Sequence, residues 1–531
     1  MVCDKCGKEL ESTALFCDAC GEKIGEELNE NVINEERETD DVASSHIDIK
    51  LKAGRFIRKV VIGIVLVIMS VFTLSNVYSF ISGVFSGDGN IEEMPIVYMK
   101  NKTDIMMESK NKKNSYKLTD SDSSSYSSEL IRFSNDNSVV FFADDFSGGE
   151  FKLYYRKTEY KQNKGKNADA NGVKIANGVS DFEIPADGKF VVYQKANKLY
   201  YSNLKKDIII DKDISDYQIS KDMKKVLYRK SDGDLYICDA GLKPKPLKLD
   251  SGVSSIVDID ESAKEIYYIK SAKLYKKENN KEPQKISSGV AGARTVEDNI
   301  FFTKQNSNMK YDLYMLKGSE GKKIGKDFYN INFYNRILTQ IDGNDIEYLI
   351  LKSDGTIISA EQVGAKVGTM GVSEDEKYFY CIEDFESGKG VLNRYNIKKD
   401  SIDNKEKIAD GVSGFKIEDD FVVVSANEYL AVYRNGKYTE LSTTSSVYEY
   451  YDGVVFYYDN YNPEKLCGEL VKYKNGKEEI VDTDVKEILV RSENDVYYIK
   501  DYNTESQTGI LYRKNGNKPK KIDTDVNYII K

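Results

Sequence analysis

A Leu-Tyr pair recurs through most of this chain and limits its fold more than any other feature. Three consecutive steps between pairs measure 36, 39 and 39 residues. A period in this range is the signature of a repeat architecture, in which each unit buries its apolar side chains against its neighbours. The pairs occur at Leu153-Tyr154, Leu199-Tyr200, Leu235-Tyr236, Leu274-Tyr275, Leu313-Tyr314 and Leu511-Tyr512.

Each repeat contains four short segments of β-forming sequence separated by turn residues. One unit reads VSDFEI, a PADG turn, KFVVYQK, KLYYSNL and DIIID. Branched and aromatic residues of this kind suit a pleated, half-buried surface, and Asp-Gly or Asn-Gly dipeptides favour tight hairpins. Four strands in about 38 residues predict the blade of a β-propeller. The hairpin dipeptides are Asp232-Gly233, Asp354-Gly355, Asn435-Gly436, Asn475-Gly476 and Asn515-Gly516.

The sequence predicts eleven such units. Ten full units run from about Ser128 to Asp523. The segments IVYMKN, DIMMES and SYKLT resemble a second, third and fourth strand, and TDVNYIIK at the C-terminus resembles a lone first strand. Together these pieces predict a split blade that closes a ring. Because eleven exceeds the usual four to eight blades, we expect two propellers in tandem instead of one large ring, with a possible junction near 325–368.

These motifs resemble the propeller-like repeat domains of unknown function in membrane proteins of low-GC Gram-positive bacteria, and loosely the TolB-type propellers. The chain has 39 Tyr and 21 Phe but no Trp, so the Trp-containing motifs of the named propeller families are missing. The resemblance implies an all-β propeller fold without implying a ligand. Tyrosine faces can stack on sugars, but their regular recurrence at strand positions favours packing between blades.

The first 25 residues carry two Cys-x-x-Cys-Gly knuckles, in CDKCGKELESTALFCDACGEKIG. Four thiolates suit a tetrahedral zinc ion, and a segment this short needs a metal to fold. A redox pair or a disulfide would not explain two matching knuckles. The segment resembles the short zinc-ribbon family found at the N-termini of many bacterial membrane proteins. We therefore predict one structural Zn²⁺ ion, with no open coordination position, bound by Cys3, Cys6, Cys17 and Cys20.

A single apolar stretch separates this ribbon from the repeats. No charged residue occurs from Val60 through Ser86. At 1.5 Å per residue this run is long enough to cross the ~30 Å hydrocarbon layer of a bilayer. Before it stand Lys50, Lys52, Arg55, Arg58 and Lys59, and after it come Asp88, Glu92 and Glu93. Positive charge stays on the cytoplasmic side, so the N-terminus is predicted to be cytoplasmic and the repeats extracytoplasmic.

The predicted organisation has five parts, among them a linker that is too polar and acidic to fold by itself. These are a zinc ribbon at 1–25, an acidic disordered linker at 26–55, a transmembrane helix at 56–84, a juxtamembrane linker at 85–95 and β-propeller repeats at 96–531.

Charge and composition restrict the function. The net charge of −10, without a basic region, argues against nucleic-acid binding. The only histidine is His46, so the repeats cannot form a Ser-His-Asp triad or an imidazole zinc site. Ser-x-x-Lys matches, such as Ser202/Lys205 and Ser413/Lys416, are expected by chance, and no carboxylate pair stands out. Three further cysteines are expected to be buried and unpaired: Cys238, Cys381 and Cys467.

The best functional hypothesis is a single-pass membrane protein that is not an enzyme. Its extracytoplasmic propeller would bind or sense a protein or envelope polymer, or act as a scaffold, while the zinc ribbon contacts a cytoplasmic protein. The alternative is a carboxylate-dependent enzyme that acts on a polysaccharide of the cell envelope. Two carboxylates about 5–10 Å apart in a central funnel, with tyrosines around them, would favour that alternative.

Overall fold

A computed structural model of the chain divides into two compact units, residues 1–77 and 78–531, and every residue described below belongs to the second. The predicted zinc ribbon, acidic linker and transmembrane helix lie outside the described residues. Within the described part, no helix has the length and apolarity needed to span a membrane. The described ranges are 94–112, 114–120, 130–159, 172–296, 298–334, 336–342, 345–361, 363–364, 366–426, 429–516 and 518–530.

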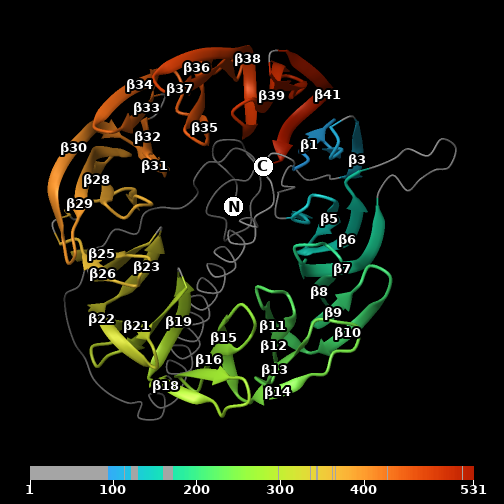
Figure 1. Ribbon diagram of the computed structural model, residues 1–531, viewed down its shortest axis with the longest axis vertical. Helices are drawn as coiled ribbons and strands as arrows, with labels where there is room; N and C mark the ends of the chain where they lie inside the picture. Colours follow the sequence, from blue (N-terminus) through green and yellow to red (C-terminus); the bar gives the residue numbers. More distant parts are fainter. Residues whose placement is uncertain are drawn as a thin grey trace, which may run out of the picture. The chain divides into compact units, whose positions relative to one another are not determined.

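The described residues form 41 β-strands, arranged in eleven antiparallel four-stranded blades (Figure 1). Blades 1 and 2 share β7, and blades 9 and 10 share β38. Blades 1 to 5 contain β4 (Ile131–Phe133), β5 (Val139–Ser147), β6 (Glu150–Lys157), β7 (Val173–Glu183); β8 (Val191–Lys195), β9 (Lys198–Ser202), β10 (Asp207–Lys212); β11 (Ile214–Ile219), β12 (Lys225–Lys230), β13 (Leu235–Asp239), β14 (Leu247–Asp250); β15 (Val253–Ile259), β16 (Glu265–Lys270), β17 (Lys273–Glu278), β18 (Gln284–Ser288); and β19 (Val290–Val296), β20 (Asn299–Gln305), β21 (Tyr311–Lys317), β22 (Glu320–Phe328).

The remaining blades follow the same order, and the last is assembled from both ends of the unit. Blades 6 to 10 contain β23 (Asn330–Tyr334), β24 (Ile337–Asp342), β25 (Asp345–Leu351), β26 (Ile357–Ser359); β27 (Met370–Val372), β28 (Tyr378–Glu386), β29 (Lys389–Ile397), β30 (Ile402–Val412); β31 (Gly414–Glu418), β32 (Phe421–Ala426), β33 (Tyr429–Arg434), β34 (Lys437–Ser442); β35 (Tyr448–Tyr451), β36 (Val454–Asn462), β37 (Cys467–Lys474), β38 (Lys477–Ser492); and β39 (Asp495–Asn503), β40 (Thr508–Asn515), β41 (Pro519–Ile530). Blade 11 combines the end of β41 with β1 (Val97–Lys100), β2 (Asp104–Glu108) and β3 (Ser115–Asp120).

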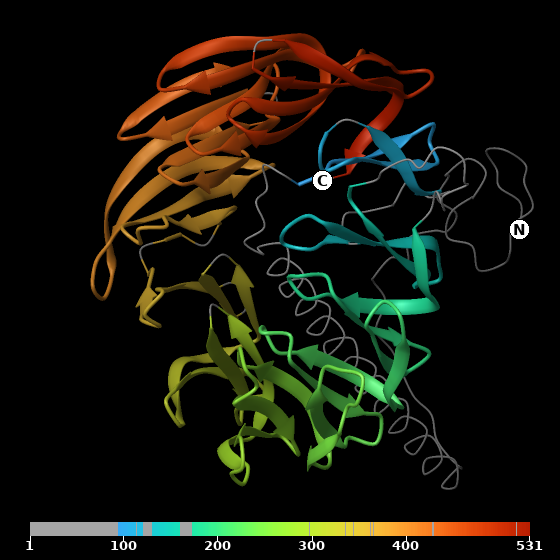
Figure 2. The ribbon, with the colours of Figure 1, turned by 45° about the vertical axis from the view of Figure 1, so that its right-hand side comes forward.

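The blades form one closed ring, and the expectation of two propellers in tandem is wrong. Eleven separate hydrophobic clusters each join one blade to the next, and the last of them joins blade 11 to blade 1. Blade 6, at the expected junction near 325–368, packs on both of its neighbours as the other blades do. The first strand of each blade lies nearest the centre and the fourth at the rim (Figures 1 and 2).

Burial on both faces of each blade explains the continuous apolar runs in the second strands. In β39, Val496 and Tyr498 pack toward blade 9, whereas Tyr497 and Ile499 pack toward blade 11. Because successive side chains of a strand point to opposite faces, a strand covered on both sides needs apolar residues at every position. Each cluster therefore combines side chains from two neighbouring blades, which follow each other in the chain except where blade 11 joins both ends of the unit.

The predicted split blade is confirmed. Strand β41 pairs with β1 in antiparallel register, with Val97 opposite Ile530 and Tyr98 opposite Ile529. Ile529 is only 3% exposed and packs in the cluster that joins blades 10 and 11. The two ends of the unit therefore meet at one edge of the ring, which also carries the turns between first and second strands and between third and fourth strands. We call this the terminal edge.

A recurring bridge between blades combines Tyr, Lys and Asp side chains. In blade 4, the hydroxyl of Tyr268 donates to Asp250 of blade 3 at 2.7 Å, and Lys270 pairs with the same carboxylate at 2.5 Å. The Tyr268 ring also stacks on Tyr275 of the Leu-Tyr pair, with centroids 5.6 Å apart. The recurring tyrosines thus pack between strands and blades, as predicted. Equivalent bridges are Tyr228/Lys230 to Asp211, Tyr498/Lys500 to Asp482, and Tyr98/Lys100 to Asp523.

Closure of the ring should be sensitive to the last strand. Ile529→Ala removes a buried side chain from blade 11, so we expect a loss of about 2–5 kcal/mol in the free energy of unfolding. The matched change Ile480→Ala, at a side chain 58% exposed on β38, should alter it by less than about 0.5 kcal/mol. Urea unfolding of residues 94–531 measures both, and equal effects of the two changes would contradict closure by β41.

The interblade bridges predict a dependence of stability on acid pH. Burial raises the pKa of Asp250, but hydrogen bonds from Lys270 and Tyr268 outweigh it and hold that pKa below its ordinary value. A lowered carboxyl pKa stabilises the fold above about pH 4 and loses this effect as the pH falls further. Asp250→Asn should therefore cost about 1–3 kcal/mol at pH 7 and clearly less at pH 3. The control Asp239→Asn, at an exposed ion pair with Lys225, should show little effect at either pH. A pH-independent cost of Asp250→Asn would contradict the role assigned to this bridge.

Candidate functional site

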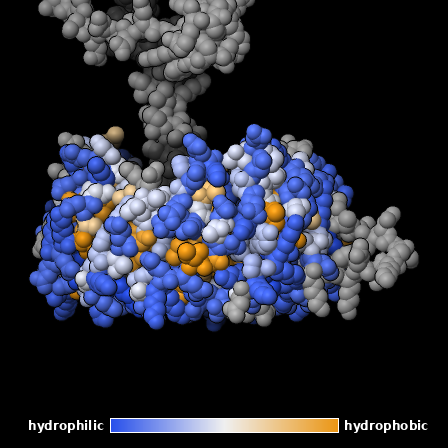
Figure 3. Space-filling view, turned by 90° about the horizontal axis from the view of Figure 1, so that it is seen from above, coloured by the Kyte–Doolittle hydropathy of each residue, from blue (hydrophilic) through white to orange (hydrophobic). Residues whose placement is uncertain are grey.

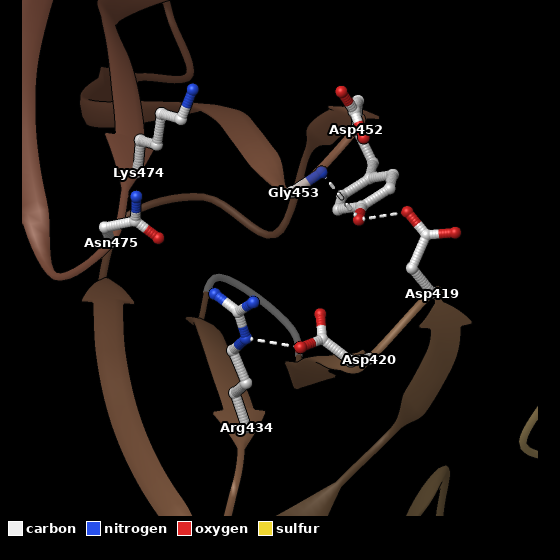
Figure 4. A pocket seen from close by; sticks show the side chains of 8 residues that line it. Asp419, Asp420, Arg434, Asp452, Gly453, Lys474 and Asn475 are labelled. Atoms are coloured by element: carbon white, nitrogen blue, oxygen red, sulfur yellow. Dashed lines mark hydrogen bonds and ion pairs between the residues drawn. The ribbon is translucent and has the colours of Figure 1, made fainter.

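A polar cavity of about 370 Å³ opens between blades 8 and 9 at the terminal edge (Figure 4). Blade 8 contributes residues from the turn between its first two strands and from the end of its third. Blade 9 contributes the corresponding turn and the hairpin between its third and fourth strands. The lining residues are Asp419, Asp420, Arg434, Tyr450, Asp452, Gly453, Lys474 and Asn475.

The local geometry of tight turns explains why this lining is polar. The hairpin between β35 and β36 has Asp452 and Gly453 at its centre, with φ angles of 42° and 75°. The hairpin between β37 and β38 has Asn475 at φ 51° followed by Gly476 at φ 79°. Two positive φ angles in succession favour Asn, Asp or Gly. The turn chemistry that ends the strands therefore also supplies carboxylate and amide groups to the cavity.

A tyrosine connects the two blades across the cavity. The Tyr450 hydroxyl donates to the Asp419 carboxylate at 2.5 Å and accepts a hydrogen bond from the Gly453 backbone N–H at 2.8 Å. Burial raises the pKa of Tyr450, and the hydrogen bond to Asp419 raises it further, so the phenol stays protonated as a donor. Nearby, Arg434 donates from Nε to Asp420 at 2.7 Å and lies over the Phe421 ring. These contacts hold the cavity walls in place.

Other groups of the cavity are open to a ligand. Asp452 and Asn475 are exposed at the tips of their hairpins. Lys474 lines the cavity and pairs with Glu493 at 2.5 Å. Lys472 and Lys474 together lower the pKa of Glu493 to about 2, which keeps that carboxylate ionised. The cavity thus offers acceptors and donors side by side, which suits a ligand rich in hydroxyl or amide groups.

A second cavity, of about 390 Å³, occupies the equivalent position between blades 4 and 5. Asp260 and Glu261 lie in the turn equivalent to that of Asp419 and Asp420, and Asp298 lies in the hairpin equivalent to that of Asp452 and Gly453. The Glu265 carboxylate accepts a hydrogen bond from the Tyr267 hydroxyl at 3.0 Å and pairs with Lys276 at 2.6 Å. The repeat therefore places similar polar cavities at separate points around one edge of the ring.

The inner strands hold a pair of carboxylates in blade 2. Asp181 and Glu183 are two residues apart on β7, which separates their Cα atoms by about 7 Å on the same face of the strand. The Tyr217 hydroxyl donates to Asp181 at 2.7 Å, and Arg132 pairs with Glu183 at 2.5 Å. Glu183 is 8% exposed, and its burial raises its pKa to about 7 in spite of Arg132.

The structure describes some of the residues that were singled out from the sequence but not others. The predicted zinc ligands Cys3, Cys6, Cys17 and Cys20 lie outside the described residues. In the Ser-x-x-Lys match at Ser413 and Lys416, Ser413 donates to the Ser425 carbonyl at 2.9 Å and Lys416 pairs with Glu418 at 2.5 Å. In the match at Ser202 and Lys205, Ser202 is buried and accepts a hydrogen bond from the Leu204 backbone N–H at 3.1 Å, whereas Lys205 is exposed. The expected burial of the other three cysteines is confirmed for Cys238, Cys381 and Cys467.

Sequence reasoning missed the cavities because each combines turns from two units. It also missed a shorter signal, a Ser-x-Asp turn between first and second strands. The Ser134 hydroxyl donates to Asp136 at 2.7 Å, and this bond, together with the Ser138 backbone N–H, lowers the pKa of Asp136 to about 2. Aligning the units on this turn would have marked the terminal edge. The same turn recurs at Ser220/Asp222 and Ser373/Asp375.

Comparison with known proteins supports the fold. A family model described as a 10-bladed beta propeller domain matches residues 392–503, which run from β29 to β39. Together with the sheet topology, this defines an all-β propeller. The described strands of this chain form eleven blades, one more than that description names. No curated protein gives a significant match.

Solved structures are similar at low identity and low TM-score. A eukaryotic initiation factor is 7% identical with a TM-score of 0.36, over 74% of this chain and 98% of that one. The dihydro-heme d1 dehydrogenase NirN is 12% identical with a TM-score of 0.31, over 61% and 75% of the two chains. The C-terminal WD40 domain of Sif2 is 12% identical with a TM-score of 0.28, over 57% and 92%.

Proposed function

We propose that this protein is a membrane-anchored binding or scaffold module whose extracytoplasmic ring binds a polar envelope component, either a protein or a polymer. The observation that carries the proposal is the recurrence of open, polar cavities at equivalent positions of one edge, between blades 4 and 5 and between blades 8 and 9. An extended ligand with repeated polar groups can occupy more than one such cavity, which raises its overall affinity.

The rigidity of the frame supports this proposal. Each blade packs on two neighbours, and hydrogen-bonded bridges such as Tyr450 to Asp419 connect the blades at the cavity itself. A ligand therefore meets side chains that are already ordered and loses little affinity to their immobilisation. Loops and turns on such a scaffold are the usual place for binding residues.

The part of the proposal that concerns the N-terminal segments is based on the amino-acid sequence alone. The uncharged run Val60–Ser86 anchors the chain with its N-terminus in the cytoplasm. The zinc ribbon formed by the four N-terminal cysteines offers a small folded surface to a cytoplasmic protein. Binding outside would thereby fix the location of that partner inside, and one structural zinc ion per chain is expected.

The second candidate function is a carboxylate-dependent enzyme that acts on an envelope polysaccharide. The pair Asp181 and Glu183, with Tyr217 on one carboxylate, is the observation that favours it. Arg132 occupies one oxygen of Glu183, which leaves that carboxyl less free to exchange a proton with a substrate. Turnover of a polysaccharide that disappears in both Asp181→Asn and Glu183→Gln would establish the enzyme over the binding module.

The predicted topology can be tested with a single introduced cysteine. Burial raises the pKa of Cys238 to about 12, and all three cysteines of the ring are buried, so they should not react with a thiol reagent. Lys198→Cys places a thiol at an exposed position at the start of β9. A membrane-impermeant maleimide should label this variant in intact cells without their wall and leave the parent chain unlabelled. Labelling of the introduced cysteine only after lysis would contradict an extracytoplasmic ring.

Ligand binding can be tested by removing side chains from the cavity without straining its turns. Asp452→Gly and Asn475→Gly act at positive φ, which glycine adopts freely. An envelope component retained by immobilised residues 94–531 should bind the double variant about tenfold or more weakly, because hydrogen bonds to its polar groups are lost.

The matched control is the double variant Asn197→Gly and Asp213→Gly. Both residues are exposed, have φ angles of 56° and 60°, and lie at the opposite edge of the ring. Binding by this control should equal that of the parent. Equal losses in both double variants, or no envelope component retained by the parent, would contradict the proposed function.

A further inference from the structure

The turn between β13 and β14 in blade 3 combines lysine, proline and exposed leucine. Residues 240–248 read AGLKPKPLK, and this short stretch holds two of the seven prolines of the chain. Leu242 is 42% exposed and Leu247 is 62% exposed. Proline fixes φ and restricts the residue before it to extended conformations. The segment therefore presents lysine and leucine side chains on a stiff, extended backbone.

The lysines of this turn are open to a partner. Lys243 and Lys245 are exposed, and neither forms an ion pair with a carboxylate of the described residues. The corresponding turn of blade 2 adds Lys205 and Lys206, which are exposed in the same way. Because blades 2 and 3 are neighbours joined by a common core, the four ammonium groups belong to one region of the terminal edge. We call Leu242, Leu247 and these four lysines the basic-apolar patch.

Charge separates by radius across the terminal edge. The turns between first and second strands, nearer the centre, are mostly acidic, whereas the turns between third and fourth strands, nearer the rim, are mostly basic. The inner turns carry Asp136, Asp187, Asp222, Asp260, Glu261, Asp298, Glu374, Asp375, Glu376, Asp419, Asp420, Asp452 and Glu493 against Lys189, Lys221, Lys224, Lys264, Arg336 and Lys377. The described residues of the outer turns carry Lys110, Lys112, Lys205, Lys206, Lys243, Lys245, Lys281, Lys352, Lys398, Lys399 and Lys518 against Glu159, Glu282, Asp354 and Asp400.

The terminal edge is also the edge to which the proposed membrane anchor is connected along the chain. Strand β1 begins there, with Val97 opposite Ile530. The juxtamembrane linker 85–95 spans at most about 40 Å even when fully extended. A chain anchored by the preceding apolar run therefore keeps this edge within a short distance of the lipid headgroups. This step depends on the proposed membrane anchor.

We propose that the basic-apolar patch docks on an anionic lipid surface and turns the terminal edge toward the bilayer. Lysines near an anionic surface are attracted to phosphate headgroups, and leucines beside them can insert at the boundary with the acyl chains. A soluble polyanion would satisfy the lysines but leave Leu242 and Leu247 in water. The combination of charge and apolar side chains therefore favours a bilayer. Figure 3 shows that apolar residues also reach other parts of the outer surface, but those of the patch are flanked by unpaired lysines.

The test uses residues 94–531, whose eleven buried clusters are all internal to that fragment and which carry no anchor. Vesicles of one part phosphatidylglycerol to three parts phosphatidylcholine should bind the fragment, and vesicles of phosphatidylcholine alone should not. Lys243→Gln with Lys245→Gln should weaken binding about 25-fold, at roughly fivefold per lysine. Leu242→Ser with Leu247→Ser should weaken it about tenfold or more without changing its salt dependence.

The matched control is Lys198→Gln with Lys212→Gln, which removes two exposed lysines from the opposite edge and should leave binding unchanged. Equal losses in the two lysine variants, or no binding by the parent fragment, would overturn the proposal. Binding to soluble polyphosphate that is as tight as binding to vesicles, with no effect of the leucine changes, would overturn it in favour of a polyanion. Because this assay uses a fragment without the anchor and changes no residue of the two cavities, its failure leaves the tests of the proposed function intact.

Discussion

Pairing of the last strand with the first is the constraint on which the structure depends. A blade with apolar side chains on both faces is stable only between two neighbours, so an open row would leave two faces in water. Strand β41 prevents this by serving as fourth strand of blade 10 and first strand of blade 11. The same strand carries Asp523, which accepts a hydrogen bond from Tyr98 and forms an ion pair with Lys100 where blades 10 and 11 meet. One segment of twelve residues thus supplies the pairing, the burial and the charged bridge that complete the ring.

A closed frame of this kind assigns different tasks to strands and turns. The strands are occupied by packing on both faces, which leaves few of their side chains for a ligand. The turns have other requirements: positive φ angles in them favour Asp, Asn and Gly, and they lie at the edges, where solvent reaches them. Polar groups therefore collect between neighbouring turns, as at Tyr450, Asp419 and Asp452, without disturbing the cores. We therefore expect the ring to bind its ligands at its edges.

The two edges differ because the ends of the unit meet at only one of them. The cavities, the acidic inner turns and the basic outer turns all share the edge where β1 begins and β41 ends. An anchor before β1 would be connected to this surface by a short linker, and the proposed lipid contact and ligand binding would then occur on the same side. The opposite edge, with Asn197 and Asp213 at its turns, provides natural controls for both proposals.

Much of the fold could be predicted from the sequence, because its signals are local. The Leu-Tyr pairs, the apolar second strands and the Asn-Gly hairpins predicted the blade, and the unmatched segments at both ends predicted its closure. The choice between one ring and two could not be read in this way. It depends on the angle at which neighbouring blades pack, for example where Phe301 and Leu349 share a cluster between blades 5 and 6. No local sequence pattern encodes that angle between blades. The cavities were missed for the same reason, since Asp419 and Asp452 belong to different units. The zinc site and the membrane span remain predictions from sequence.

The most direct test of the closed ring is an electron-microscopy image of residues 94–531 viewed along the axis of the ring. We predict a single ring with eleven blades, closed between the first and last strands. Two smaller rings side by side, an open arc, or a ring with a different number of blades would contradict closure by β41.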